Sequence, residues 1–553
     1  MGERRFERNL LNKAMVEGLV GPGCSGGNQR LDTPGGRFQV RWDEGGSATA
    51  LGQLVFFAEF LEVSGLFKRW VQGCPLPYTS PNAPTVTDVL GTWLLSILDG
   101  QWRYAHITGL RGDAVAPAIL DMQRILSDES LRRALSALAP NQPRRCPDVE
   151  RARRTAQLAG STAWMDAALA ESVVEALGTA WILDCDTTVK PLYGRQAGAE
   201  VSYNPQKPGR PSQVVHTYWI SPLRLVLDAD VQGGKSHAAK HGLPRLCALL
   251  AGLTPAQRPA LVRGDIAFGN EGVMAELETL GQAYLFKLRQ TPGVKRLIER
   301  QWSRRDWQSV GQGFDAVETS LQLAGWSRAR RVVVLRRRVR DRLLAEVPRH
   351  AQPGQQTLLF ADAKADIKLW EYAVLVSHGD HPLDAIGQLY RDRADCENGF
   401  DELKNQWGWG GYTTHDLERC NLSARAVALV YNWWSWYVRL AHPQARREAI
   451  TSRPLLLSGV ARMTEHAGQK RLLITLTHAA GDQIQAMLAA IRAGLDHVRA
   501  TAPQLANRER WRALVQYIID QILTAKAAQA PPSRCPGTFQ YATQCGQIGR
   551  AHV

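Results

Sequence analysis

The sequence lacks several patterns that define common protein classes. No two cysteines form a C-x-x-C pair, and the nine cysteines are scattered from Cys24 to Cys545. This distribution argues against a disulfide scaffold or a structural zinc site and is typical of a protein in a reducing compartment. No apolar run approaches the roughly 20 residues of a membrane-spanning helix. The charged start, MGERRFERNLL, also lacks the apolar segment of a signal peptide. We therefore expect a cytoplasmic protein without a membrane partner.

Two catalytic signatures are missing as well. The absence of G-x4-G-K-[ST] argues against a P-loop nucleotidase, and the absence of a nucleophile elbow argues against a Ser/His/Asp hydrolase. Positive charge, in contrast, is abundant. The 67 Lys and Arg against 52 Asp and Glu give a formal charge of +15. Such a basic balance favours a polyanionic partner, of which nucleic acid is the commonest.

Composition divides the 553 residues into segments. Residues 1–40 are polar and rich in glycine, and we expect a flexible arm there. Residues 41–150 and 441–530 carry apolar residues at helical spacing and predict helical N- and C-terminal regions. We interpret residues 531–553 as an unstructured tail. Its last residues, QIGRAHV, resemble the translation of a sequencing-adaptor read, which makes the tail a candidate artefact that resequencing of the gene would test.

The middle of the chain predicts a mixed α/β pattern. TAWILDCDTTV predicts a strand, QVVHTYWI and LRLVLDADV predict a hairpin, and PALVRGD and AYLFKL predict strands that each follow a helix. The alternation stops after residue 290, and residues 291–377 predict a β-rich insertion. Residues 287–349 hold sixteen Lys or Arg against six Asp or Glu, a net of +10. That excess favours a phosphate-binding surface over a merely solvated sheet edge.

Three acidic residues have a context that suits metal binding. Asp186 lies in LDCDTTV, Asp265 ends PALVRGD, and Glu397 lies in a helix predicted over residues 384–406. Carboxylate oxygens are the ligands that Mg²⁺ and Mn²⁺ prefer, and a pair of such ions supports in-line phosphoryl transfer. Asp184 precedes Asp186 by two residues and therefore points to the same face of the strand. Either could be the first ligand.

The predicted helix that carries Glu397 gathers other residues suited to a phosphodiester. Tyr390, Arg393, Glu397 and Lys404 are spaced by 3, 4 and 7 residues, and in a continuous helix they share one face about 60° wide. The cations would bind phosphate oxygens and the phenol would donate a hydrogen bond. The spacing alone fits a salt-bridged helix surface equally well.

The pattern Y-x2-R-x3-E-x6-K in LYRDRADCENGFDELK resembles the YREK signature of bacterial insertion-sequence transposases. These enzymes form a group within the insertion-sequence-four superfamily of DDE transposases. The resemblance extends through LDCDTTV and VRGDIAFGNE and covers roughly residues 155–440. It implies an RNase H-like mixed-sheet catalytic core over residues 155–290 and 378–440, with the β-rich insertion between them. The separations of 79 and 132 residues between the acidic positions agree with an insertion before Glu397.

The resemblance also implies a role for each candidate residue. Asp186, Asp265 and Glu397 would bind Mg²⁺, which Mn²⁺ could replace, with Asp186 preferred to Asp184 because the family's first Asp typically precedes a Thr. Contacts to the phosphate of the transposon end fall to Tyr390, Arg393 and Lys404. Trp326, which precedes the basic run SRARR in the insertion, is the residue that we expect to stack on a displaced base.

The implied function is a DNA transposase of the bacterial cytoplasm and nucleoid. It would bind the inverted repeats of an insertion sequence through residues 41–150, act as a dimer on double-stranded DNA, and join the cleaved 3′-OH ends to target DNA. Two alternatives remain open: a metal-dependent nuclease of the same fold that only hydrolyses DNA, and a catalytically inactive DNA-binding derivative.

Overall fold

The computed structural model describes residues 29–40, 47–141, 145–178, 180–204, 207–221, 223–338, 370–412, 414–475, 479–501, 504 and 506–529. The predicted tail and most of the predicted arm lie outside these ranges. The described end of the arm forms a hairpin of β1 (Gln29–Thr33) and β2 (Gly36–Val40). Among the described helices, none has the length and apolarity that crossing a lipid bilayer requires.

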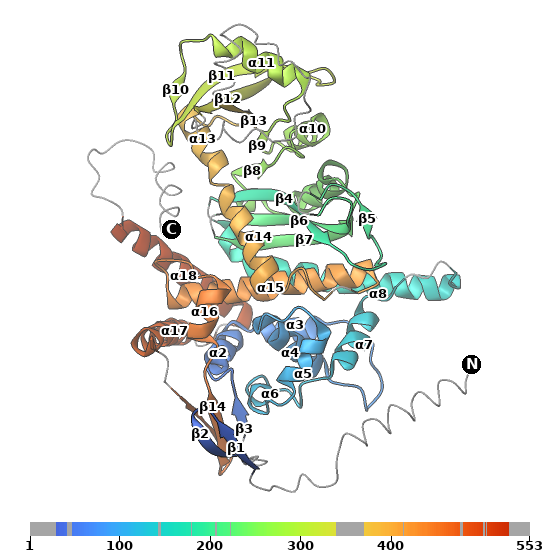
Figure 1. The fold of residues 1–553 in the computed structure, drawn as a ribbon, viewed down its shortest axis with the longest axis vertical. Helices are drawn as coiled ribbons and strands as arrows, with labels where there is room; N and C mark the ends of the chain where they lie inside the picture. The colour runs from blue at the N-terminus through green and yellow to red at the C-terminus, as the bar shows by residue number, and fades with distance from the viewer. Residues whose placement is uncertain are drawn as a thin grey trace.

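One mixed sheet of ten strands occupies the upper half of the molecule in Figure 1. Its order is β10-β11-β12-β13-β9-β8-β4-β6-β5, with β7 paired to β6. Strands β4, β8 and β9 are mutually parallel neighbours, and the other pairs are antiparallel. The strands are β4 (Ile182–Pro191), β5 (Glu200–Val201), β6 (Pro211–Ser221), β7 (Leu225–Gly233), β8 (Leu261–Gly264), β9 (Tyr284–Lys287), β10 (Gln308–Ser309), β11 (Phe314–Leu321), β12 (Arg330–Arg338) and β13 (Trp370–His378). The predicted mixed α/β class is confirmed.

The strands of the predicted insertion continue this sheet. β13 pairs antiparallel with β9, so that Val376 lies opposite Phe286. The insertion also begins with a helix, α11 (Pro292–Trp302), which the β-rich prediction did not include. Strand β9 would otherwise present a row of unpaired backbone groups, and pairing with β13 satisfies them. The basic segment is therefore joined to the core by backbone hydrogen bonds.

Helices precede, separate and follow these strands along the chain. They are α2 (Leu54–Ser64), α3 (Leu66–Gly73), α4 (Val86–Leu98), α5 (Ile107–Leu110), α6 (Val115–Ile119), α7 (Asp128–Leu138), α8 (Asp148–Val173), α9 (Leu243–Gly252), α10 (Glu271–Thr279), α13 (Leu383–Arg391), α14 (Ala394–Gln406) and α15 (Leu417–Ala441). Figure 1 shows α8 and α15 crossing the molecule between the sheet and the N-terminal helices. Almost all of α15 is buried, as expected of a helix with partners on every side.

Buried side chains fasten α15 to its neighbours, and Asn432 makes the most hydrogen bonds of them to β7 and α8 together. Asn432 is fully buried, and its amide both donates to the carbonyl of Val226 and accepts from the N–H of Val226, each at 2.8 Å. The same amide donates to Ser172 Oγ at 2.9 Å. Because a buried amide without partners would destabilise the core, these bonds fix α15 in register against β7 and α8.

The C-terminal region contains a hairpin that the helical pattern did not predict. Helices α16 (Ala449–Leu456), α17 (Gly481–Thr501) and α18 (Asn507–Gln529) flank β14 (Ala461–His466) and β15 (Gln469–Ile474). Between the two strands, Ala467 and Gly468 have φ angles of 50° and 73°, which is the backbone of a tight primed turn. β14 then pairs with β3 (Ser47–Thr49) in a three-stranded sheet, seen at the bottom of Figure 1.

A buried ion pair joins the two central parallel strands. Asp184 on β4 and Arg263 on β8 are both fully buried. Nε and Nη2 of Arg263 each lie 2.6 Å from a carboxylate oxygen of Asp184. Burial lowers the pKa of Arg263, but the charge of Asp184 outweighs this effect and the pKa is raised. Arg263 therefore stays charged, and its partner cannot be lost without leaving that charge buried alone.

We expect Asp184→Asn to destabilise the protein by about 3–5 kcal/mol, the usual cost of removing one partner from a buried ion pair. The urea midpoint should fall. Asp32→Asn is the matched control, because Asp32 pairs with Arg37 in an exposed hairpin where both side chains are more than half exposed. An unchanged midpoint for Asp184→Asn would mean that the pair does not stabilise the sheet.

Candidate active site

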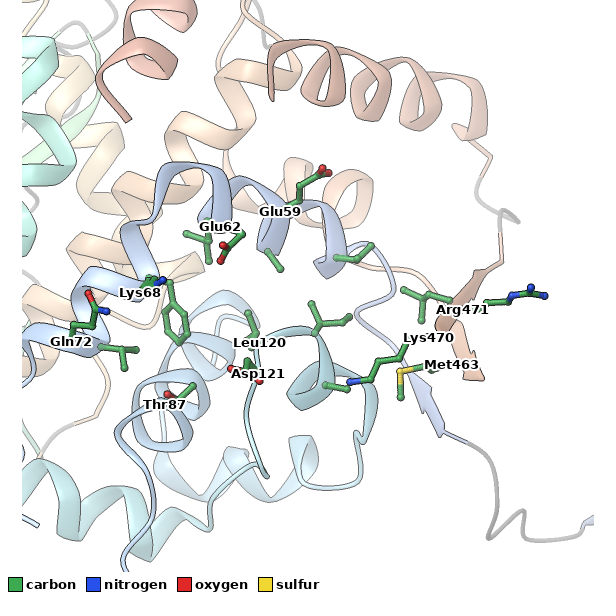
Figure 2. Close-up of a pocket in the computed structure, with 18 residues that line it drawn as sticks. Glu59, Glu62, Lys68, Gln72, Thr87, Leu120, Asp121, Met463, Lys470 and Arg471 are labelled. Carbon is green, nitrogen blue, oxygen red and sulfur yellow. The ribbon is translucent and has the colours of Figure 1, made fainter. Parts of the chain in front are cut away.

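The predicted site residues do not line the cavity shown in Figure 2. That cavity, of about 720 Å³, lies between α2, α3 and the small sheet, with Glu59, Glu62 and Lys470 among its walls. None of the candidate catalytic or DNA-binding residues contributes to it. The candidate site lies instead where β4 and β8 meet the helices α13 and α14.

The parallel register of β4 and β8 brings two carboxylates side by side. Cys185 pairs with Gly264, so the next residues on the two strands are Asp186 and Asp265. The Asp186 side chain is 14% exposed and accepts a hydrogen bond from the N–H of Thr187. Asp265 is half-buried and accepts from the N–H of Ala267 at 2.9 Å, which fixes the turn after β8. Two aspartates that are 79 residues apart in the sequence therefore lie at the same edge of the sheet.

The helix predicted over residues 384–406 is interrupted. α13 ends at Arg391 and α14 begins at Ala394. At the break the N–H of Arg393 donates to the carbonyl of Tyr390, three residues back, which tightens the turn. The carbonyl of Leu389 instead accepts from Nη1 of Arg263. The buried arginine thus takes up a backbone group that a continuous helix would have used, and the prediction of one unbroken helix is wrong.

Arg393 bridges two of the three predicted metal ligands. Its Nη2 lies 2.8 Å from Oδ2 of Asp186, and its Nη1 lies 3.2 Å from Oε1 of Glu397. The Arg393 side chain is only 7% exposed, whereas Glu397 is 63% exposed. The charge of Asp186 raises the pKa of Arg393, although burial alone would lower it.

The electrostatics place Asp265, the third predicted metal ligand, in the same cluster. Burial raises the pKa of Asp186 to about 6; Arg393 lowers it, while the negative charges of Asp265 and Glu397 raise it further. Two nearby carboxylates disfavour the ionised form of a third carboxyl group. The three predicted ligands therefore lie within electrostatic reach of one another.

Two other predicted residues belong to this cluster. Burial raises the pKa of Tyr390 to about 12, and the nearby charges include Arg393, Asp265, Glu397 and Asp186. Burial lowers the pKa of Lys404, which the charge of Asp186 opposes. The structure thus gathers six of the seven predicted site residues around Asp186, although the break in the helix changes how they are presented.

Asp184 and Asp186 differ in what surrounds them. Asp184 is fully buried and committed to Arg263, whereas Asp186 reaches the cluster of carboxylates. Sequence reasoning left both open because it did not consider Arg263. The signal was a charged residue within the apolar run PALVRG, where an arginine needs a buried partner.

The chemistry of the cluster fits a hard divalent cation. Its donors are carboxylate oxygens. Burial first, and the neighbouring carboxylates second, raise the pKa of Asp186, and a bound cation would favour its ionised form. In the described ranges, no three His, Cys, Asp or Glu side chains converge on one point as a metal site requires. The guanidinium of Arg393 lies between Asp186 and Glu397 instead.

Trp326 lies apart from this cluster. It occupies the turn between β11 and β12 and is half-buried against the core. The guanidinium of Arg330 lies 5.2 Å from the centroid of its ring, and Arg330 is itself held by Glu271 and Glu278 on α10. One face of the indole is therefore covered.

Comparison with known proteins gives a family match over most of the chain. Residues 36–494 match the family described as Transposase DDE domain group 1. The cryo-EM structure of a piggyBac transposase synaptic complex with hairpin DNA is similar at 11% identity, over 90% of this chain and 88% of that one. Its TM-score of 0.38 is too low to support a structural inference. No curated protein gives a match.

The raised pKa of Asp186 predicts that Asp186→Asn stabilises the metal-free protein. Because the pKa rises from 3.8 to about 6 on folding, the folded state holds more protons between these pH values, and stability falls as pH rises through this window. Above pH 6 the variant should be more stable than wild type by about 3 kcal/mol, and below pH 4 the two should agree. Urea unfolding in EDTA measures this. Equal free energies of unfolding for wild type and Asp186→Asn from pH 4 to 7 would contradict this prediction.

Proposed function

The chain belongs to the family of transposases with a group 1 DDE domain, and on that premise we propose that it mobilises a bacterial insertion sequence. Family membership makes it a metal-dependent enzyme of DNA cleavage and transfer. In the proposal it binds the ends of the element, cleaves them by two-metal phosphoryl transfer, and joins the 3′-OH ends to target DNA. The observation that supports this most is that three carboxylates, two cations and a phenol lie within electrostatic reach of one another in the cluster that contains Asp186.

The strand order supports an RNase H-like core. Within the larger sheet, five strands follow the order β7-β6-β4-β8-β9. The first three along the chain, β4, β6 and β7, are antiparallel neighbours, and β8 and β9 then add in parallel on the other side of β4. Asp186 lies on β4, Asp265 directly follows β8, and Glu397 lies on α14, after the insertion.

In this proposal Asp186, Asp265 and Glu397 would hold Mg²⁺, which Mn²⁺ could replace. When bound, the ions would supply charge stabilisation to the entering and leaving oxygens of the phosphodiester. The chain's own residues position the DNA. Lys404 and Tyr390 would meet phosphate oxygens beside the carboxylates, by charge and by a donated hydrogen bond respectively.

Arg393 has two parts in the proposal. In the metal-free protein its guanidinium pairs with Asp186 and Glu397, and it thereby holds the helix break against β4. With cations held by the carboxylates, the guanidinium would be free to bind a phosphate of the transposon end. Trp326, on the basic insertion, remains our proposed contact to a base, through the ring face that Arg330 does not cover.

The partners in this proposal are double-stranded DNA, namely the terminal inverted repeats and the target, and a second copy of the chain, since both ends must be held together. The enzyme would act in the bacterial cytoplasm, on the nucleoid. A nuclease of the same fold, or an inactive DNA-binding derivative, would differ in one respect. Only a transposase joins a DNA end to a target duplex, so a strand-transfer assay with a duplex copied from the DNA flanking the gene separates the three.

Changing Asp186, Asp265 or Glu397 to Ala should abolish cleavage and strand transfer of that duplex while binding is retained. Each carboxylate is proposed to hold metal, and the chemistry needs the complete set. Asp32→Ala, in the exposed hairpin, is the control and should cleave normally. Wild-type activity should require Mg²⁺ or Mn²⁺ and stop in EDTA. Cleavage that survives exhaustive chelation would rule out the two-metal mechanism.

Lys404→Ala should weaken end binding and reduce its salt dependence. One lost phosphate contact lowers the slope of log affinity against log salt by about 0.9. Arg393→Ala should have a similar effect. Lys470→Ala is the control, because Lys470 lies on the small sheet in Figure 2 and the slope should not change. If both site variants keep the wild-type slope, Lys404 and Arg393 do not contact phosphate and only form ion pairs on the helix surface.

A further inference from the structure

Trp102 is the only tryptophan of the described ranges that is exposed, with 49% of its surface accessible. It lies in the loop between α4 and α5, in the N-terminal helical region. Its ring has one aromatic neighbour, His106, with ring centroids 5.3 Å apart in an edge-on arrangement. The adjacent Arg103 is also exposed. Proteins that bind single-stranded nucleic acid combine a large aromatic surface with a neighbouring guanidinium, so that a base stacks on the ring and a phosphate binds the cation.

The backbone of Trp102 is held by the loop beside it, while about half of the residue stays exposed. The N–H of Tyr412 donates to the Trp102 carbonyl at 2.8 Å. Gly408 and Gly411 pack so closely that a Cβ on Gly411 would lie 2.2 Å from that carbonyl, and one on Gly408 would lie 2.4 Å from the carbonyl of Gln101. The Trp102 atoms in this packing are its carbonyl oxygen, Cα and Cβ, and none belongs to the indole ring. The fold therefore positions the indole without burying it, and ordering the ring costs little when a ligand binds.

The loop that holds Trp102 is tied to the candidate active site from two sides. Residues 407–412 directly follow α14, the helix of Glu397 and Lys404. Lys190 Nζ donates to the carbonyl of Gly411 at 3.1 Å. Lys190 lies four residues beyond Asp186 on β4 and on the same face, a distance of about 13 Å along the strand. The Lys190 side chain and the loop extend this path beyond the strand, so Trp102 is connected to the candidate site over the length of several nucleotides of a DNA strand.

We propose that Trp102 is a base-stacking residue for the DNA end. Its indole takes an unpaired base several nucleotides from the cleaved phosphodiester, and Arg103 binds a neighbouring phosphate. This inference rests on the proposed function, because it needs a DNA end in the site. It assigns to the N-terminal region a direct contact close to the chemistry, in addition to any role in binding the end sequence.

The experiment uses the full chain and a duplex copied from the DNA flanking the gene, with 2-aminopurine placed in turn at each of the last eight positions. Wild type should change the fluorescence at a position several nucleotides from the cleaved phosphodiester as that base leaves the stack, apart from any change at the base that Trp326 contacts. Trp102→Ala should lose this change and cleave about five- to a hundredfold more slowly, the range of one lost stack. Trp102→Phe should restore most of both. Leu473→Ala, which removes an exposed apolar side chain on β15, should match wild type.

An abasic site at the responding position gives the decisive comparison. It should slow wild type to the rate of Trp102→Ala and slow that variant no further, because the same contact is already lost. Additive losses, or the absence of any position whose fluorescence change is lost in Trp102→Ala and kept in Trp326→Ala, would overturn the assignment. Wild type that binds but neither cleaves nor joins the unmodified duplex would instead overturn the proposed function and this inference together.

Discussion

The ion pair of Asp184 and Arg263 is the constraint from which the geometry of the site follows. Burying two charges is costly, and the cost is offset only when every hydrogen-bonding group finds a partner. Here the guanidinium binds Asp184 through two nitrogens, and its third reaches the carbonyl of Leu389. The first contact locks β4 against β8, and the second sets where α13 breaks from α14. A single buried cation therefore relates both strands of the site to the helix that faces them.

The charges of the candidate site are compensated less completely than those of this ion pair. Arg393 shares its charge between Asp186 and Glu397, yet the pKa of Asp186 stays raised because burial and the neighbouring carboxylates outweigh one guanidinium. A structural ion pair satisfies its charges, whereas this cluster leaves negative charge unsatisfied. Residual charge of this kind costs stability and is typical of positions kept for binding or catalysis. The two aspartates of one strand thus differ, because Asp184 is committed to a structural ion pair and Asp186 lies in the cluster of carboxylates.

Sequence reasoning predicted the elements whose pattern is local. The strands β4, β6, β7 and β8 agree with the predicted runs, and α10 begins where Asn270 caps it. What it could not predict depends on distant partners. The break between α13 and α14 contains neither proline nor glycine, and Arg263, which takes up the freed carbonyl, lies 126 residues earlier. The pairing of β13 with β9 and the choice between Asp184 and Asp186 likewise appear only when separate segments meet.

The pairing of β3 with β14 has a consequence for the order of folding. Residue 49 lies opposite residue 461, so this small sheet closes a loop of about four hundred residues. During synthesis at roughly 5–20 residues per second, β3 waits at least about 20 seconds for its partner to leave the ribosome. Contacts between residues so far apart in the sequence also form late in folding, because the entropy of closing the loop must be paid first. The wall of the cavity in Figure 2 that β14 and β15 provide is therefore among the last parts of the molecule to be completed, after the sheet that carries the candidate site has all of its strands.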